Sequence, residues 1–370
     1  MTSVDDIRAQ ALEVASGWSP SDQPESWRLT AALFTMIAGH DELLAALSAL
    51  PPERMPALLA SAAVTFLVRR TEPTPLSRYF PVAGRPQPPL DDDFGSAAAA
   101  FVSARLPDIM AICASHTYQM NEVARCAQIA LGISAMHSQG PIALVDLGTG
   151  AGLGLQLDRY QYEIDGHGTG PSDAGLTLTC EVRGDNQPPR LELPPITSRA
   201  GIDLNPVDLG DPAARGWLEA CLPPEASALT RLDLAIEISR QTPARVVSGD
   251  AVEALPGVLA SMPPDLPVIV TDAFLAVFLS AAGRAKLFTT LSEASRSRPV
   301  TWLSLNPLVP LGPTGHDSVQ GLAVPERLIA DYQEHGVFAV LGARTFEHAA
   351  EGGTLLARAH PSGLWVEWLA

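Results

Sequence analysis

Basic residues are scarce in this sequence. Lys and Arg together number 24, against 41 Asp and Glu, so the formal net charge is −17. An acidic surface repels the phosphate backbone of nucleic acids, and we therefore expect no nucleic-acid partner. A small-molecule substrate that carries an amine or another cationic group fits this charge balance better.

Cysteine is also sparse, and long uninterrupted apolar runs are missing. The four cysteines show no CxxC spacing, which predicts reduced thiols and no metal site. Residues 1–6 are polar, and no signal-peptide core follows them. The longest apolar run, residues 267–283, is interrupted by Asp272 and so predicts a strand and a helix rather than a membrane span. We expect a cytoplasmic protein that does not bind a membrane.

Several catalytic and phosphate-binding motifs are absent as well. The sequence contains no HExxH, no GxSxG and no GK[ST], which argues against a zinc protease, an α/β-hydrolase and a phosphate-binding P-loop. Apolar material is abundant, however. Hydrophobic residues make up 46% of the 370 positions and charged residues 18%, which is enough for a sizeable packed core.

The first part of the chain has apolar residues at helical spacing. This spacing predicts an N-terminal helical domain over residues 1–139, with a long helix over residues 116–137. A proline-rich stretch, residues 71–89, interrupts the helices and contains Arg78-Tyr79-Phe80-Pro81 in an irregular loop.

From residue 140 onward, short apolar strands alternate with helices. This alternation predicts the α/β class, with a Rossmann-like, doubly wound and mostly parallel sheet over residues 140–370. An alternating pattern between residues 159 and 199 predicts an inserted β-hairpin. Two last alternating runs, residues 354–359 and 364–368, predict an antiparallel hairpin at the edge of the sheet.

A glycine-rich turn directly follows the first of these strands. Asp146, Gly148, Gly150 and Gly152 form a D-x-G-x-G-x-G pattern at the carboxyl end of the strand, where open α/β sheets bind ligands. The dinucleotide fingerprint GxGxxG fails, because its third glycine would fall at Leu153. The pattern resembles motif I of class I methyltransferases, whose glycines make room for S-adenosylmethionine (SAM). The alternative is a tight structural turn.

Acids follow the next two strands. Asp203 is placed to accept both ribose hydroxyls of SAM with its two carboxylate oxygens. Asp250 and Ala251 follow the third strand, where methyltransferases place an acid near the adenine amine. For each Asp the alternative is a helix N-cap. Together with the glycine turn, these residues predict a SAM site without a metal.

Five segments match a known family: Arg78-Tyr79-Phe80-Pro81, residues 118–126, residues 144–160, Gly201-Ile202-Asp203 and residues 355–361. Together they resemble the actinobacterial DUF2332 family over nearly the whole chain. The resemblance implies a Rossmann-like, methyltransferase-like fold. Members of that family often read Gly-Ala-Ser-Ala-Gly-Leu-Asn in the glycine turn, whereas this chain reads Gly148-Thr149-Gly150-Ala151-Gly152-Leu153-Gly154.

The segment before the first strand concentrates polar residues that we expect at a substrate site. Glu122 is a candidate catalytic base or ammonium anchor, and Arg125 is a candidate ligand for a carboxylate, sulfate or phosphate. Asn121 lies four residues before Arg125, so the two would be neighbours on a helix surface. The alternative is a solvated ion pair. The expected substrate-binding residues are Tyr79, His116, Gln119, Asn121 and Arg125.

Asp272 is a second candidate base. It follows the fourth strand, where methyltransferases keep residues that face the substrate. Its apolar neighbours would raise its pKa, which suits a group that takes up a proton near neutral pH. The alternative is again a helix N-cap.

Three functions fit these residues. The first is a small-molecule-modifying enzyme that transfers a methyl group from SAM to an N or O nucleophile. The second is a methyltransferase-fold enzyme that does not use SAM and catalyses an elimination or ring closure on an amine-bearing metabolite in secondary metabolism. The third is a non-catalytic partner subunit, or a homo-oligomer, with an interface on the long helical N-terminal region.

Overall fold

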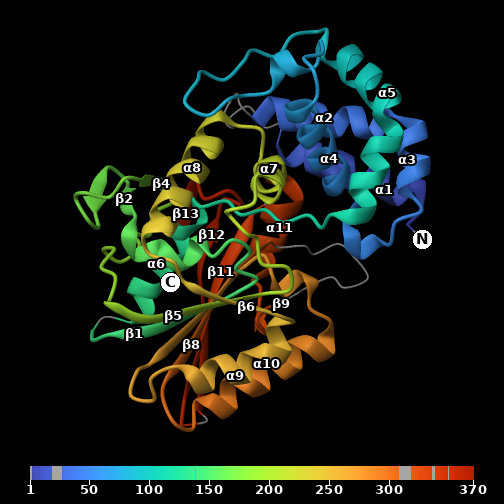
Figure 1. Ribbon diagram of the computed structural model, residues 1–370. Coiled ribbons are helices and arrows are strands. Elements are labelled where there is room, and N and C mark those ends of the chain that lie inside the picture. The colour runs from blue at the N-terminus through green and yellow to red at the C-terminus, as the bar shows by residue number, and fades with distance from the viewer. Residues whose placement is uncertain (1, 19–26, 138, 308–317, 336–337, 349) are drawn as a thin grey trace. The chain divides into compact units, whose positions relative to one another are not determined.

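The computed structural model of the chain describes residues 2–18, 27–137, 139–307, 318–335, 338–348 and 350–370 (Figure 1). The chain divides into two compact units. The first consists of Met1–Asn121 and Asp208–Asp233, and the second of Glu122–Val207 and Leu234–Ala370. Residues 122–139 thus group with the sheet, whereas the change of sequence pattern at residue 140 had suggested a boundary there.

The first unit is helical. Its helices bury apolar faces in a shared core that includes Leu33, Ile37 and Leu44. Local sequence fixes some helix starts: Ser3 and Asp6 form a capping box. The elements are α1 (Val4–Gly17), α2 (Trp27–Gly39), α3 (Asp41–Leu47), η1 (Pro52–Arg54), α4 (Pro56–Arg70), η2 (Ser77–Tyr79), α5 (Phe94–Ser115), α7 (Pro212–Cys221) and the first part of α8 (Ala226–Gln241).

Among the described residues, one helix, α5, is long and apolar enough to cross a membrane by length and composition alone. A core helix of a water-soluble protein passes the same test. Phe101, Val102 and Ile109 of α5 are buried, and the helix packs against α2, α3 and α4. α5 therefore contributes these side chains to the core of the first unit.

The long helix expected over residues 116–137 is wrong. α5 ends at Ser115, and residues 116–122 are not helical. A separate helix, α6 (Arg125–Met136), then begins in the second unit. The chain passes from one unit to the other within the interval that was expected to be helical.

The break before α6 has a local cause. The Glu122 carboxylate accepts the backbone N–H of Ala124 at 3.0 Å, a side-chain-to-backbone hydrogen bond that competes with helical pairing. Asn121 is consequently outside α6. The four-residue spacing that would have placed Asn121 beside Arg125 on a helix surface does not apply.

The second unit is built on an 11-stranded sheet. Its strands are β1 (Ile142–Leu147), β2 (Gln161–Ile164), β3 (His167–Thr169), β4 (Thr177–Arg183), β5 (Ile196–Asp203), β6 (Arg245–Ser248), β7 (Val268–Ala273), β8 (Val300–Pro307), β11 (Ala339–Glu347), β12 (Ala350–Ala359) and β13 (Trp365–Trp368). Their order is β3-β2-β4-β13-β12-β11-β8-β7-β1-β5-β6. β6, β5, β1, β7 and β8 are parallel, and β11 is antiparallel to both β8 and β12. A small separate sheet pairs β9 (Ser318–Val319) with β10 (Leu322–Ala323).

Helices cover both faces of the large sheet. α9 (Ala251–Ser261) and α10 (Ala281–Ala294) pack on one face, against buried side chains such as Trp302. α6 lies on the other face, where leucines of β8 and β11 approach the bare Cα of Gly132. α11 (Glu326–His335) packs into a smaller apolar cluster. The predicted α/β class with a mostly parallel sheet is confirmed.

Residues 159–199 do more than form an inserted hairpin. β2 and β3 form a hairpin whose Asp165-Gly166 turn has φ angles of 48° and 76°. β4, however, pairs in parallel with both β2 and β13, so the segment extends the large sheet. The hairpin of β12 and β13 therefore lies inside the sheet, and its expected position at the edge is wrong. Pairing with β4 satisfies the backbone groups that an edge strand would expose.

Candidate functional site

The glycine turn follows β1, which lies between β5 and β7. Gly148, Gly150 and Gly152 have φ angles of 68°, 57° and 74°, a left-handed conformation that glycine adopts at little steric cost. Gly148 is exposed, whereas Gly150 and Gly152 are buried. A ligand can therefore approach the turn at Gly148.

The backbone N–H groups of the turn bind to the chain itself. Those of Gly148 and Thr149 donate to the carbonyl of Ile202 at 2.8 and 3.2 Å. That of Gly150 donates to Oδ2 of Asp203 at 2.7 Å. A phosphate-binding nest would direct such donors at the ligand. The turn is therefore suited to close approach by a ligand rather than to capture of a phosphate.

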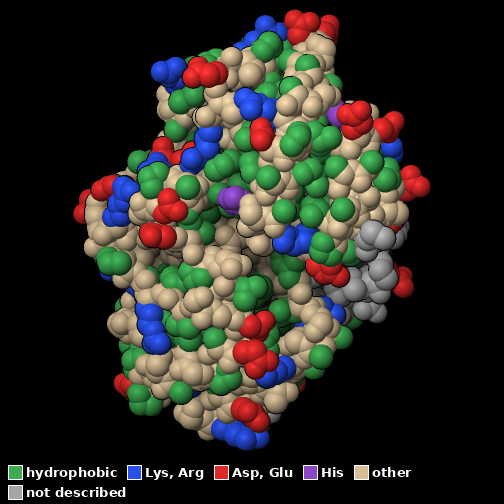
Figure 2. All heavy atoms as spheres, turned by 45° about the vertical axis from the view of Figure 1, so that its right-hand side comes forward, with side chains coloured by type: hydrophobic (Ala, Val, Ile, Leu, Met, Phe, Trp, Pro, Cys, Tyr) green, Lys and Arg blue, Asp and Glu red, His purple; other side chains and the backbone are tan. Residues whose placement is uncertain are grey.

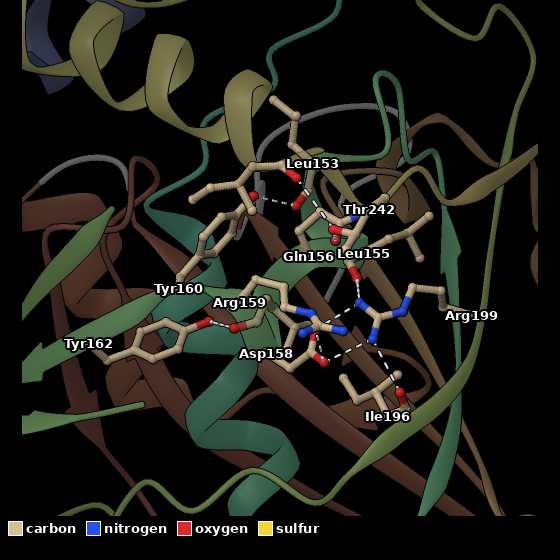
Figure 3. Close-up of polar contacts among 12 residues, drawn as sticks. Leu153, Leu155, Gln156, Asp158, Arg159, Tyr160, Tyr162, Ile196, Arg199 and Thr242 are labelled. Atoms are coloured by element: carbon tan, nitrogen blue, oxygen red, sulfur yellow. Dashed lines mark hydrogen bonds and ion pairs between the residues drawn. The ribbon is translucent and has the colours of Figure 1, made fainter. Parts of the chain in front are cut away.

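A short 3₁₀ helix, η3 (Leu153–Arg159), follows the turn. Figure 3 shows how the chain is held there. Arg199 of β5 binds both carboxylate oxygens of Asp158, at 2.7 and 2.8 Å, and the Tyr160 hydroxyl donates to the Leu153 carbonyl at 2.8 Å. These contacts anchor the chain directly after the glycine turn.

Asp203 and Leu204 lie at the end of β5, next to the turn. The Asp203 carboxylate is buried, and it accepts the N–H of Gly150 and, at 2.8 Å, that of Asn205. Leu204 follows directly and is 66% exposed. The sequence predicted the acid at this place, while the exposed apolar side chain beside it was not predicted.

Asp250 and Ala251 follow β6. Asp250 caps α9, because its Oδ1 accepts the N–H groups of Val252 and Glu253 at 2.9 and 3.0 Å. The Asp250 side chain is exposed, and Ala251 is buried as the first residue of the helix. Asp250 is thus a helix cap that solvent can also reach.

Asp146 lies near the end of β1 and is partly buried. The hydroxyl of Thr271 in β7 donates to its Oδ1 at 2.8 Å. Burial raises the pKa of Asp146 to about 6 despite this hydrogen bond, and the carboxylates of Asp272 and Asp203 add to the rise. Gly154 makes room for the carboxyl, since a Cβ there would lie 3.0 Å from Oδ2. Asp146 is therefore a carboxyl that can exchange a proton near neutral pH.

Asp272 is almost fully buried, at 1% exposure. Trp302 Nε1 donates to its Oδ2, and Asn306 Nδ2 donates to its Oδ1, each at 2.9 Å. The N–H of Ala276 also reaches Oδ1, at 3.3 Å. Burial raises the pKa of this carboxyl. Because its oxygens bind two side chains of β8 and the backbone of the loop after β7, Asp272 is placed to organise this edge of the sheet.

Glu122 and Arg125 are both only 5% exposed, so the alternative of a solvated ion pair is wrong. Arg125 Nε donates to the carbonyl of Pro361 at 2.7 Å. The Arg125 guanidinium also lies over the ring of Phe274, 3.9 Å from its centroid. Arg125 thus connects the start of α6 to the turn after β12 and to the loop after β7.

The other expected substrate residues belong to the first unit. Tyr79 is buried, and its hydroxyl donates to the carboxylate of Asp91, which follows the proline-rich stretch. His116 packs against Trp217, with ring centroids 4.5 Å apart. Gln119 and Asn121 are partly buried in the non-helical segment. Contact of these four residues with a substrate stays a prediction.

Three features at the edge of the sheet were missed by sequence reasoning. Phe274 has a left-handed φ of 67°, for which its residue type gives no signal. The turn formed by residues 360–363 is buried, and Gln128 of α6 donates to the His360 carbonyl at 3.0 Å. Asn306 is a buried amide in an apolar strand. Gln128 and Asn306 are polar residues inside otherwise apolar elements, and this pattern could have indicated buried polar contacts there.

On the face that Figure 2 shows, basic side chains stand in small groups among acidic and hydrophobic ones. Within the described part of the chain, no three His, Cys, Asp or Glu side chains are grouped so that they could hold a metal ion.

The fold and this edge define a class: an α/β protein whose parallel strands end in a glycine turn and several carboxyls. A family model with the description "Uncharacterized protein conserved in bacteria (DUF2332)" matches residues 16–368. The chain therefore belongs to the DUF2332 family, which confirms the resemblance of its five segments. The comparison with curated proteins gave no match. Because a fold alone does not specify a reaction, function has to be argued from the site.

Proposed function

We propose that this protein is a cytoplasmic, small-molecule-modifying enzyme that binds SAM at the glycine turn and transfers its methyl group to an N or O nucleophile. The observation that supports this most directly is the exposed, left-handed Gly148 at the end of β1. Ligands bind at the carboxyl ends of strands in open α/β sheets, and a bare Cα permits close approach there.

The residues around Gly148 suit an adenosyl group. Leu204, 66% exposed at the end of the neighbouring strand, offers an apolar surface for a purine ring. Asp250, exposed after β6, offers an acceptor for an exocyclic amine. When bound, SAM supplies an activated methyl group with its own leaving group, so the chain would need only to orient the two reactants.

Calorimetric titration with SAM and with S-adenosylhomocysteine tests this function. We expect heat and a rise in Tm with both compounds. Leu204→Ala should weaken binding about tenfold, since it removes apolar contact area, and should leave Tm unchanged because the side chain is exposed. Leu12→Ala, at a residue 49% exposed in the first unit, is the matched control and should bind like the unaltered protein. Absence of both heat and thermal shift with the unaltered protein would refute the proposal.

A second function is favoured by Asp146, whose pKa of about 6 and partial exposure suit a general base. In this alternative the protein catalyses an elimination or ring closure on an amine-bearing metabolite without SAM. Glu122 and Asp272, which the sequence suggested as bases, are buried, so Asp146 is more accessible than either.

Turnover of amine-bearing metabolites without added SAM distinguishes the two functions. Asp146→Asn should abolish such turnover, because the amide cannot accept a proton at neutral pH. Asp250→Asn should retain it, since Asn also caps helices and the side chain is exposed. Turnover that survives Asp146→Asn would exclude Asp146 as the base.

A further inference from the structure

The loop after β7 contains a strained residue. Phe274 has a φ of 67°, in the left-handed region where a bulky side chain is unfavourable. Such residues persist only where surrounding contacts hold them, and they occur preferentially at functional sites. The contacts that hold Phe274 therefore indicate which part of the site this strained conformation supports.

Three contacts hold this loop. The N–H of Phe274 donates to the Leu305 carbonyl of β8 at 2.7 Å. The N–H of Ala276 donates to the buried Asp272 carboxyl. The ring of Phe274 lies under the Arg125 guanidinium at 3.9 Å, close enough for a cation–π interaction. The strained backbone is thus fixed on its sheet side and on its α6 side.

Arg125 is itself held in place. It is buried, and its Nε donates to the Pro361 carbonyl at 2.7 Å. The turn that contains Pro361 packs closely against the start of α6, because a Cβ at Gly363 would lie 2.3 Å from the carbonyl carbon of Ala124. These contacts leave the guanidinium plane a defined position over the Phe274 ring.

The residue after Phe274 contacts the glycine turn. Leu275 Cδ1 and Cβ lie 3.3 and 3.4 Å from the position that a Cβ at Gly148 would take. Gly148 is nevertheless exposed, and Leu275 is partly buried. Leu275 therefore stands beside the open approach to Gly148 without closing it.

We propose that Leu275 is a wall of the ligand space over Gly148 and that Arg125 is a positioning residue, which holds Leu275 there through the strained Phe274. The identity of the ligand rests on the proposed SAM function. The contacts of Arg125 with Pro361 and Phe274 support this role, and its expected role as a ligand for a carboxylate, sulfate or phosphate stays a prediction.

Hydrogen exchange of the unliganded protein tests the positioning role without reference to any ligand. In Arg125→Lys, which keeps the charge but loses the planar stacking group, exchange of the Phe274 and Ala276 amides should rise about tenfold. Phe274→Leu removes the ring instead and should give the same rise. Arg344→Lys is the matched control, since Arg344 also lies over a ring, that of Phe288, and donates to a backbone carbonyl. Unchanged exchange in both Arg125→Lys and Phe274→Leu would overturn the positioning role.

Ligand titration tests the wall. Leu275→Ala should weaken SAM binding about tenfold, and because Leu275 is partly buried against the core it should also lower Tm. Arg125→Lys should weaken binding in the same direction. Unchanged or tighter binding by Leu275→Ala would overturn the assignment. If the unaltered protein binds no SAM, the proposed function fails and the wall fails with it. The exchange experiment still decides the role of Arg125 in that case.

Discussion

The turn after β1 and the loop after β7 follow neighbouring strands and both enter the left-handed region. The turn after β1 does so at Gly148, Gly150 and Gly152, whereas the loop after β7 does so at Phe274. Glycine adopts this conformation readily, while a non-glycine residue in a sparsely populated region costs about 1–3 kcal/mol. The local sequence therefore favours the conformation of the glycine turn, whereas tertiary contacts hold that of Phe274.

The partners of the two segments differ accordingly. The glycine turn binds the neighbouring strand β5, through the Ile202 carbonyl and the Asp203 carboxylate. The loop after β7 binds β8 and α6, through Leu305 and Arg125. Mutations can test this difference: the conformation of the turn should depend on its glycines, and the conformation of the loop should depend on its contacts.

The largest effect is expected from Asp203→Ala. Its carboxylate accepts two backbone N–H groups, and we expect the free energy of unfolding to fall by about 3 kcal/mol when this charged acceptor is lost. Urea unfolding at pH 7 measures the change. Hydrogen exchange then tests whether the glycines alone specify the turn. If they do, the free energy of opening at the turn amides should fall by no more than the free energy of unfolding does.

Asp250→Ala is the control for this prediction. Asp250 also accepts two backbone N–H groups, but it is exposed, so its loss should cost only about 1 kcal/mol. Equal losses in the two variants would mean that Asp203 has no special part in holding the glycine turn.

Much of the second unit could be predicted from the sequence. The sequence pattern predicts strands over residues 142–147, 244–249, 267–271 and 300–305, and a strand that leads into residues 201–203; β1, β6, β7, β8 and β5 match them closely. The helices predicted over residues 252–260 and 283–295 match α9 and α10. The glycine turn at Gly148, with Asp146 and Asp203 beside it, could likewise be predicted, because glycine and aspartate after a strand are typical of such turns.

The remainder depends on contacts between residues far apart in the sequence. β4 joins the sheet because Glu181 pairs with Trp365, which no local pattern indicates. At the start of α6, the Glu122 side chain bonds to the backbone, a competition with helical pairing that helical spacing alone does not reveal. The conformation of Phe274 depends on Arg125, 149 positions earlier by their residue numbers. Local sequence propensity contains no information about these three contacts.

A pH-dependent effect is expected at Asp146, whose bond to Thr271 connects β1 to β7 and so links the two segments. Its pKa is raised from 3.8 to about 6 in the folded protein, chiefly by burial. The folded state therefore favours the protonated carboxyl. Its contribution to stability is present below pH 4 and is lost as the pH rises through about 6, a change on the order of 2 kcal/mol.

Comparison with Asp146→Asn isolates this titration, because the amide oxygen can still accept the Thr271 hydroxyl. The difference in unfolding free energy, unaltered protein minus variant, should fall between pH 4 and pH 6. A flat difference would show that the pKa of Asp146 is unshifted in the folded protein, and a rising difference that it is lowered. Either result would weaken its case as a general base.

The smallest effect is expected from Gly148→Ala. A left-handed alanine costs about 1 kcal/mol, and its Cβ would press on Leu275 at 3.3 Å, so the loss should slightly exceed that value. Gly140→Ala is the matched control, since Gly140 has a φ of 80° and nothing within 4 Å of its added Cβ. The stability difference between the two variants measures the contact between the two segments alone.

SAM titration adds the functional readout: Gly148→Ala should lose affinity and Gly140→Ala should not, because only Gly148 lies where the ligand is expected. Equal affinities would separate the glycine turn from ligand binding and leave it a structural turn.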